Sequence, residues 1–240
     1  MKKVKFLLKI LIILLLLFLT INFFGTIYAY CTPKFDIKSA NSFYMYDNKL
    51  ELVFYGKGED KWVNLKDMNN LIIDATISVE DKNFYKHNGF NFFRIAKAMY
   101  ENLKHGEIVQ GASTITQQYA KNLFLSFDKT WKRKWQEMWI TFELETHYSK
   151  DEILEGYLNT INYGNGCYGI ANASKFYFNK DVKDLNLAEA TILAGIPNSP
   201  YYYEPIGNYE TAKERQKIVL NRMYENKYIT KEELENAYNE

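Results

Sequence analysis

The sequence predicts a mostly α-helical domain that follows a single N-terminal transmembrane helix. Three observations predict this fold class. Residues 10–30 carry no charge, apolar side chains recur at helical spacing from residue 69 onward, and strand-like patterns are almost absent after that point. A chain of 240 residues is also long enough to bury one sizeable core.

Residues 10–30 form an uncharged run that is long enough to cross a hydrocarbon core of roughly 30 Å. Four lysines precede it, and the positive-inside rule then places residues 1–9 in the cytoplasm as a basic tail and the later residues outside the membrane. A cleaved signal peptide is the alternative, but no small-x-small cleavage site precedes Cys31. The sequence therefore favours an uncleaved single-pass anchor in the cytoplasmic membrane, with an extracytoplasmic domain.

Charge and cysteine content exclude several function classes. The first 30 residues contain four lysines and no acid, which leaves 26 basic and 29 acidic residues for the rest of the chain. No basic field covers the domain, so we expect no nucleic-acid partner. The two cysteines and three histidines lack the spacing of a zinc site, and no glycine-rich phosphate loop is present. We therefore expect no organic cofactor.

Residues 31–68 are predicted to be an exposed connector with short extended pieces, such as residues 50–55 before Gly56. Residues 69–240 then form the predicted helical domain. Phe92 and Phe93 open its second helix, and such an aromatic start is more typical of a core position than of membrane contact. Helices are expected over residues 69–80, 91–103, 113–124, 131–147 and 209–227.

Helix start signals place three further boundaries. Ser149-x-x-Glu152 is a capping-box signature, Asn186-x-x-Glu189 is a similar start, and residue 230 opens the last helix in the same way. Gly195, with a proline two residues later, is expected to close the helix that begins after residue 186. These signals predict that short loops join the helices of the domain.

Residues 111–118 have the sequence Gly-Ala-Ser-Thr-Ile-Thr-Gln-Gln, in which polar side chains dominate without charge. In a helix over residues 113–124, steps of about 100° place the apolar side chains Ile115, Tyr119 and Leu123 on one arc. The opposite, polar arc consists of Ser113, Thr114, Gln117, Gln118 and Lys121. Such an arc suits the hydroxyl and amide groups of a ligand, but a solvated helix face that Ser113 caps is an equal alternative from the pattern alone.

Flanking motifs decide between these alternatives. Residues 80–89 read Glu-Asp-x-x-Phe-x-x-His-x-Gly, residues 133–137 read Arg-Lys-Trp-Gln-Glu, and further motifs occupy residues 153–159 and 163–166. The ordered set resembles the family 51 glycosyltransferases, which are the peptidoglycan-polymerising transglycosylases. These enzymes occur alone or as the first domain of bifunctional penicillin-binding proteins. The resemblance covers the chain from about Leu71 to the C-terminus and implies a lysozyme-like fold.

The resemblance also implies a reaction. The 4-hydroxyl of an acceptor sugar attacks C1 of a lipid-linked sugar, which inverts the anomeric centre and expels a polyprenyl diphosphate. Lipid II, the growing lipid-linked glycan and membrane lipids are the expected partners, together with cell-wall synthesis proteins. No Ser-x-x-Lys or Lys-Thr-Gly set follows the motifs, so we expect the monofunctional biosynthetic form.

Glu80 and Glu137 are the predicted catalytic residues. Glu80 is expected to accept the proton of the attacking hydroxyl, because a carboxylate within about 3 Å of a hydroxyl can act as a general base. Glu137 is similar to the second acidic residue of the family, which holds the diphosphate end directly or through a divalent cation such as Mg²⁺ or Mn²⁺. The alternative for Glu137 is an ordinary helical ion pair with Arg133, worth about 0.3–0.5 kcal/mol.

The leaving diphosphate requires positive charge, and basic residues are concentrated between residues 121 and 134. Arg133 can bind a phosphate through two parallel hydrogen bonds, whereas Lys121 and Lys134 act as point charges. Lys134 is the weakest of the three candidates. The four uncharged members of the polar arc are expected to bind the substrate beside them: Ser113, Thr114, Gln117 and Gln118.

Two other functions compete with polymerisation. A lytic transglycosylase or muramidase-like hydrolase would use a protonated Glu80 and would need Lys121 and Arg133 little, because no diphosphate leaves. A non-enzymatic, membrane-tethered glycan-binding scaffold would tolerate the loss of Glu80. Reaction with lipid II and with finished glycan separates all three hypotheses.

Overall fold

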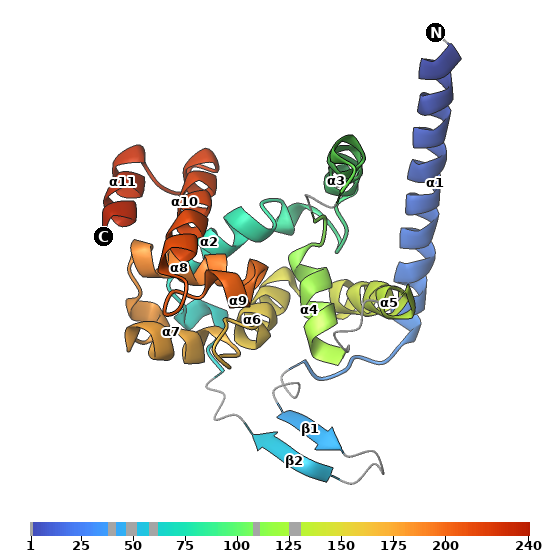
Figure 1. Cartoon of the computed structure of the whole chain (residues 1–240). Helices are drawn as coiled ribbons and strands as arrows, with labels where there is room; N and C mark the ends of the chain where they lie inside the picture. The colour runs from blue at the N-terminus through green and yellow to red at the C-terminus, as the bar shows by residue number, and fades with distance from the viewer. Residues whose placement is uncertain (1, 38–41, 47–51, 58–61, 108–110, 125–130) are drawn as a thin grey trace.

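The computed structural model describes residues 2–37, 42–46, 52–57, 62–107, 111–124 and 131–240. Most of these residues are helical, as the sequence predicts, and a two-stranded hairpin is the sheet among them. The first helix stands at one side of the molecule, and the C-terminal helices lie at the opposite side (Figure 1). The helices are α1 (Lys2–Cys31), α2 (Asn70–Glu80), α3 (Phe92–His105), α4 (Ile115–Phe124), α5 (Trp131–His147), α6 (Lys150–Thr160), α7 (Ile170–Phe178), α8 (Leu187–Gly195), α9 (Pro200–Tyr203), α10 (Tyr209–Glu225) and α11 (Lys231–Asn239).

Short 3₁₀ turns and strands complete the described elements. The turns are η2 (Leu65–Asp67), η3 (Phe84–Lys86), η4 (Val182–Asp184) and η5 (Ile196–Asn198), and the strands are β1 (Ser42–Tyr46) and β2 (Leu52–Lys57). The two strands pair antiparallel, with Tyr44 opposite Tyr55, and project away from the helices (Figure 1). The extended piece predicted within residues 31–68 is thus largely β2.

The core forms where two groups of helices pack. Helix α2 contacts both α8 and α10, and α4 lies between α5 and α6. Ile72, Tyr119, Leu154 and Val219 are fully buried and come from α2, α4, α6 and α10 respectively. Because α2 ends at this junction, its last residue lies between the two groups of helices.

Parts of the predicted connector are buried, which differs from the exposed segment that the sequence predicts. Ile37 is 4% exposed and belongs to the core. The carboxylate of Glu155 on α6 accepts hydrogen bonds from Trp62 Nε1 at 2.7 Å and from the Leu65 backbone at 2.8 Å. Asn159 accepts another from the Val63 backbone at 2.9 Å. These contacts fasten the segment after the hairpin to α6.

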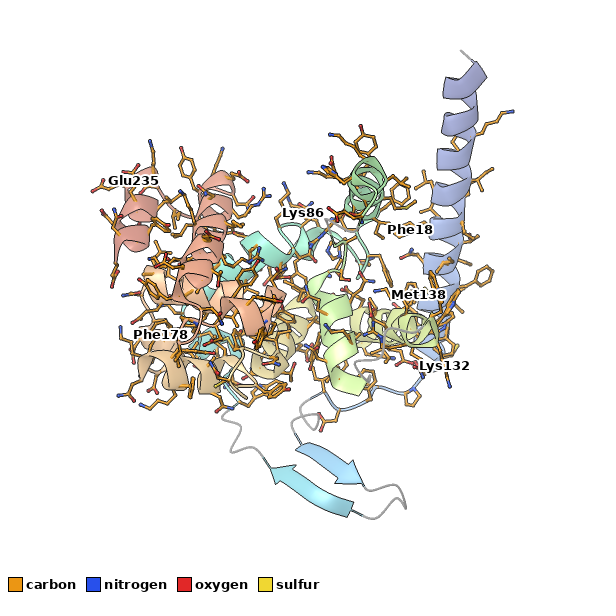
Figure 2. All side chains as sticks on the ribbon, viewed as in Figure 1. Phe18, Lys86, Lys132, Met138, Phe178 and Glu235 are labelled. Atoms are coloured by element: carbon orange, nitrogen blue, oxygen red, sulfur yellow. The ribbon has the colours of Figure 1, made fainter. Side chains whose placement is uncertain are left out.

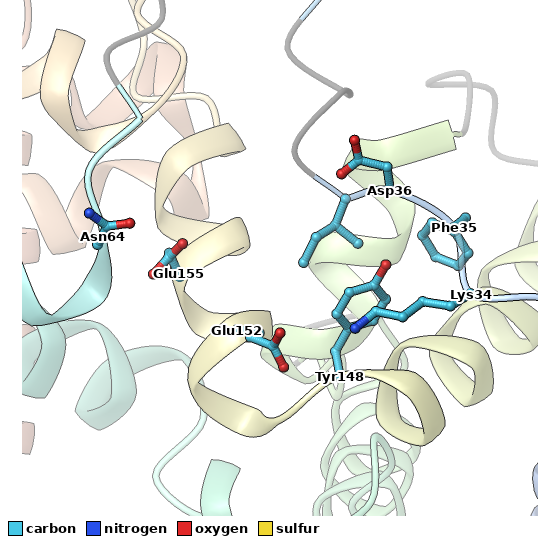
Figure 3. A pocket seen from close by; sticks show the side chains of 8 residues that line it. Lys34, Phe35, Asp36, Asn64, Tyr148, Glu152 and Glu155 are labelled. Carbon is cyan, nitrogen blue, oxygen red and sulfur yellow. The ribbon is translucent and has the colours of Figure 1, made fainter.

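A cavity of about 600 Å³ lies between the first part of the connector and α6. In Figure 3, Glu152 and Glu155 line one side of this cavity, and Lys34 and Tyr148 line the other. The Lys34 ammonium lies 4.2 Å from the centre of the Tyr148 ring, which is a cation–π contact. The cavity therefore borders the same Glu155 that fastens the connector.

Helix boundaries follow the predicted start signals closely. Residues 149, 186 and 230 each form a complete capping box, and α5 has the predicted bounds 131–147. The prediction for α4 is wrong at its start, because the helix begins at Ile115 and not at Ser113. Thr114 Oγ1 accepts a hydrogen bond from the Gln117 backbone at 3.2 Å, so Thr114 takes the capping position that we assigned to Ser113.

Helix α1 spans the predicted anchor and packs against α5. The ring of Phe18 lies 5.3 Å from that of Phe92 on α3, and the ring of Tyr28 lies 4.9 Å from that of Trp139 on α5. Among the residues that the structure describes, no helix combines the length and apolarity that a membrane crossing needs. The transmembrane anchor therefore stays a prediction.

The packing of α4 on α6 depends on Gly156. A Cβ atom at this position would overlap the phenol of Tyr119, which is fully buried. We expect Gly156→Ala to lower the free energy of unfolding by about 1–3 kcal/mol, because the ring must shift in a close-packed core. Chemical denaturation measures this loss. Gly111→Ala is the matched control, since no atom lies within 4 Å of its added Cβ, and an equal loss in both variants would contradict the prediction.

Candidate active site

Glu80 is the last residue of α2, and its side chain is buried in the junction between the helix groups. Gln118 of α4 donates a hydrogen bond from Nε2 to Glu80 Oε2 at 2.7 Å. The other oxygen, Oε1, accepts no hydrogen bond from any residue that the structure describes. Arg215 of α10 lies near this oxygen, with its Nη2 atom at 3.8 Å. Oε1 is therefore a buried oxygen whose lone pairs accept no hydrogen bond from the described residues.

Tyr157 helps to orient the amide that binds Glu80. Its hydroxyl donates to Gln118 Oε1 at 3.4 Å, which leaves the Gln118 amide nitrogen directed at the carboxylate. Burial raises the pKa of Tyr157 and of Tyr163 well above the ordinary range, and the negative charge of Glu80 raises both further. Both phenols therefore stay protonated and act as hydrogen-bonding groups.

Asp81, the neighbour of Glu80, has a structural role, because it connects the end of α2 to the start of α4. It is 1% exposed, and its Oδ2 atom accepts a hydrogen bond from the Ile115 backbone at 3.2 Å, where α4 begins. A carboxylate at a helix N-terminus is stabilised by the helix dipole. His87 Nε2 lies 2.9 Å from the same oxygen. Asp81 thus joins the end of α2 to the start of α4, which sets the position of Gln118 relative to Glu80.

Arg94 on α3 fixes the backbone at the same point. Its Nη1 atom donates to the carbonyl of Glu80 and lies 3.9 Å from Asp81 Oδ1. Asn91 caps α3 by accepting from the Arg94 backbone at 3.0 Å. Sequence reasoning included His87 only as a member of the motif over residues 80–89, and it assigned no role to Arg94 or Arg215, because nothing in their local pattern indicates contact with residues 80 and 81.

The predicted polar arc is divided by the structure. Thr114 and Gln117 are buried. Thr114 Oγ1 donates to the Gly89 carbonyl at 2.6 Å, and Gln117 Oε1 accepts from the Thr114 backbone at 3.2 Å. Ser113 is partly exposed just before α4, and Gln118 reaches Glu80. Direct substrate contact by Thr114 and Gln117 stays a prediction, whereas Gln118 lies at the carboxylate.

The predicted cations gather around Lys121. Burial lowers the pKa of the Lys121 ammonium. The negative charge of Glu137 opposes this shift, Arg133 and Lys134 add to it, and Glu80 opposes it. Lys121 therefore lies in the electrostatic field of both predicted catalytic carboxylates and of the other two cations.

Glu137 on α5 is 3% exposed and forms an ion pair through Oε1 with Lys134 Nζ. A helical ion pair with Arg133 was the alternative reading of Glu137, and the structure pairs Glu137 with Lys134, the weakest of the three candidates for diphosphate contact. Within the described ranges, no group of three or more His, Cys, Asp or Glu side chains could hold a metal ion. Glu137 thus offers a single carboxylate, and Mg²⁺ can be held by one carboxylate together with phosphate oxygens.

An apolar cavity of about 290 Å³ adjoins this cluster, between α1 and α5. Phe18 and Met138 line it from these two helices (Figure 2). Lys134 and Gln117 contribute polar groups to its wall. A charged group and an apolar chamber therefore lie next to each other, an arrangement that suits an amphiphile.

A buried carboxylate and cations that interact with the same lysine, Lys121, are typical of an enzyme of the group-transfer class. A family model described as transglycosylase matches residues 48–224. The chain belongs to the transglycosylase family, whose members are the peptidoglycan glycosyltransferases that the motifs predict.

Two penicillin-binding proteins and one solved structure are similar to this chain. Penicillin-binding protein 2D of Bacillus subtilis (strain 168) is 50% identical over 209 residues, which cover 87% of this chain and 30% of that protein. Penicillin-binding protein 1A of Neisseria lactamica is 45% identical over 197 residues, covering 82% and 25%. The 2.6 Å crystal structure of penicillin-binding protein 1A from Haemophilus influenzae has a TM-score of 0.46 and 25% identity, covering 83% and 20%. This chain spans less than a third of the length of these relatives.

Proposed function

We propose that this protein polymerises the glycan strands of peptidoglycan from lipid II. The observation that carries the proposal is Glu80 Oε1, a buried carboxylate oxygen with no hydrogen-bond donor among the described residues, whose carboxylate interacts electrostatically with Lys121. An acceptor 4-hydroxyl can donate its proton to this oxygen as it attacks C1 of the lipid-linked sugar. Inversion at C1 then releases a polyprenyl diphosphate.

The cations stabilise the charge that grows on the leaving diphosphate. Arg133 binds it by its planar fork, and Lys121 and Lys134 act as point charges. Glu137 holds Lys134 in place, and it is the residue that would hold a divalent cation such as Mg²⁺ or Mn²⁺ against the diphosphate. Such a cation would supply further positive charge to the departing group.

The lipid part of the substrate occupies the apolar cavity beside Lys134. A polyprenyl chain starts at the diphosphate, so its first units must lie close to the cations that bind that group. Aromatic side chains such as Trp135 and Phe142 line this space and offer the apolar contact that such a chain needs. The growing lipid-linked glycan and membrane lipids are further partners that this arrangement supports.

Family membership supports a lysozyme-like fold for residues 69–240, and the mostly helical architecture agrees with it. Residues 10–30 serve as an uncleaved single-pass anchor, and residues 1–9 lie in the cytoplasm. The catalytic domain then lies on the outer side of the cytoplasmic membrane, where it meets lipid II and cell-wall synthesis proteins.

One experiment separates this function from its two alternatives. The purified full chain is incubated with lipid II in one reaction and with finished glycan in another. Polymer from lipid II supports the proposal, whereas fragments of finished glycan indicate a hydrolase or lytic transglycosylase. No reaction with either substrate, together with binding to glycan, indicates a scaffold.

The membrane anchor is tested by mass spectrometry. We expect protein extracted from membranes to retain its N-terminal peptide, because the apolar run of residues 10–30 lacks a cleavage site. Substituting small residues at positions 28 and 30 provides the control, since these changes introduce a cleavage signal before Cys31. A natural chain that begins near Cys31 would show that the segment is a signal peptide.

A further inference from the structure

Arg215 is a buried cation next to the predicted catalytic base. It comes from the middle of α10, far from the motifs that predict the site, and its Nη2 atom lies 3.8 Å from Glu80 Oε1. The two side chains are 12% and 7% exposed. The pair is therefore largely removed from water.

A buried carboxylate requires compensation for its charge. The hydrogen bond that Glu80 receives through Oε2 comes from the neutral amide of Gln118. Burying an ionised group is costly unless it is paired, and removing one partner of a buried pair is strongly destabilising. Among the described residues, Arg215 is the one whose cation lies within 4 Å of the carboxylate.

The surrounding structure holds Arg215 in place from two sides. Its guanidinium carbon lies 5.5 Å from the centre of the Tyr203 ring on α9, which is a cation–π contact. On the other side, Gly195 of α8 leaves room for the stem, because a Cβ atom there would lie 2.9 Å from Arg215 Cγ. Arg215 therefore occupies a prepared position and does not depend on Glu80 alone for its orientation.

The separation of 3.8 Å exceeds a hydrogen bond. At this distance the guanidinium offsets the charge of the carboxylate but leaves the buried Oε1 atom without a hydrogen-bond donor among the described residues. Other groups act on Glu80 from different directions. Lys121 on α4 and the phenols of Tyr157 and Tyr163 interact with its charge, and Arg94 on α3 binds its backbone carbonyl.

We propose that Arg215 is a positioning residue, which offsets the buried charge of Glu80 and keeps Oε1 directed at the acceptor hydroxyl without binding that oxygen itself. The structural part of this inference is independent of the reaction. Its catalytic part rests on the proposed function, because it assumes that Glu80 deprotonates a hydroxyl.

A double-mutant cycle in thermal stability tests the structural part. We expect Arg215→Gln to lower the melting temperature of the otherwise unchanged protein by roughly 6–20 °C, because it leaves a buried carboxylate without its partner. In a Glu80→Gln background, the same substitution should leave the melting temperature unchanged or raise it, because it removes a buried cation that has lost its partner. Equal shifts in both backgrounds would overturn the inference.

Polymerisation kinetics with lipid II test the catalytic part. We expect Arg215→Gln to lower kcat by about a hundredfold with little change in KM, since a misplaced base slows the reaction of bound substrate. Arg215→Lys should recover part of kcat. Arg222→Gln is the matched control, because Arg222 lies on the same helix but is 54% exposed and pairs with Glu225.

The outcomes are distinct. An Arg215→Gln variant that keeps its kcat, or loses it only as much as Arg222→Gln does, overturns the catalytic part. A kcat of Arg215→Lys that is no higher than the kcat of Arg215→Gln also overturns the catalytic part. An unchanged chain that makes no polymer from lipid II contradicts the proposed function itself, and the stability cycle still decides whether Arg215 is the partner of Glu80.

Discussion

Glu80→Gln should slow polymerisation of lipid II by about 10²–10⁴-fold, which is the range that a general base contributes. The substitution keeps the size of the side chain and a polar group opposite Gln118, but it removes the atom that accepts the proton. Single-turnover measurements, with the enzyme in excess over lipid II, report this step directly, because they exclude product release.

The matched control for this variant is Glu235→Gln on α11, where the carboxylate is 60% exposed and far from the site in Figure 2. It removes one negative charge without touching the junction, so its turnover should equal that of the unchanged chain. Turnover of Glu80→Gln close to that of the control would rule out Glu80 as the base.

Arg133→Ala should remove about 2.7–4 kcal/mol of transition-state stabilisation, by analogy with the loss of one preorganised hydrogen-bond donor. The reason is that charge grows on the diphosphate as its bond to C1 breaks, and a cation placed there acts mainly in the transition state. Arg133→Lys should recover only part of the activity, because an ammonium cannot reproduce the planar fork. The rate of polymerisation of each variant gives its activity, and its melting temperature, measured in parallel, gives its stability.

Lys132→Ala is the control for Arg133, because Lys132 is an exposed neighbour on α5 (Figure 2). If Arg133 were an ordinary surface charge, its loss would change stability by a few tenths of a kcal/mol and leave turnover unchanged. Activity that falls at a constant melting temperature supports contact with the diphosphate, and unchanged activity refutes it.

Local signals in the sequence predicted most of the helices. A capping box needs only four consecutive residues, so Ser149 and Asn186 marked their helices correctly. The apolar arc of α4 was also correct, because Ile115 and Tyr119 are fully buried. The motifs around Glu80 and Glu137 predicted the family, which the match over residues 48–224 shows.

Local sequence signals could not predict contacts between elements that lie far apart in the sequence. Arg215 lies on a helix of ordinary amphipathic pattern, and only the packing of α10 against α2 brings it to Glu80. The burial of Thr114 and Gln117 within the polar arc of α4 is likewise something that periodicity cannot indicate, and their contact with the substrate stays a prediction. The pattern favoured a core position over membrane contact for the aromatic start of α3, yet Phe93 is 84% exposed.

The adjacent carboxylates of Glu80 and Asp81 have a consequence for mutational screens. Asp81 contacts the start of α4, so a screen that scores only product formation would find both positions equally intolerant. Their defects should nevertheless differ in kind. A variant at Asp81 should be rescued by cooling or by a compensating stabilising substitution elsewhere, whereas no gain in stability can restore a missing proton acceptor at Glu80.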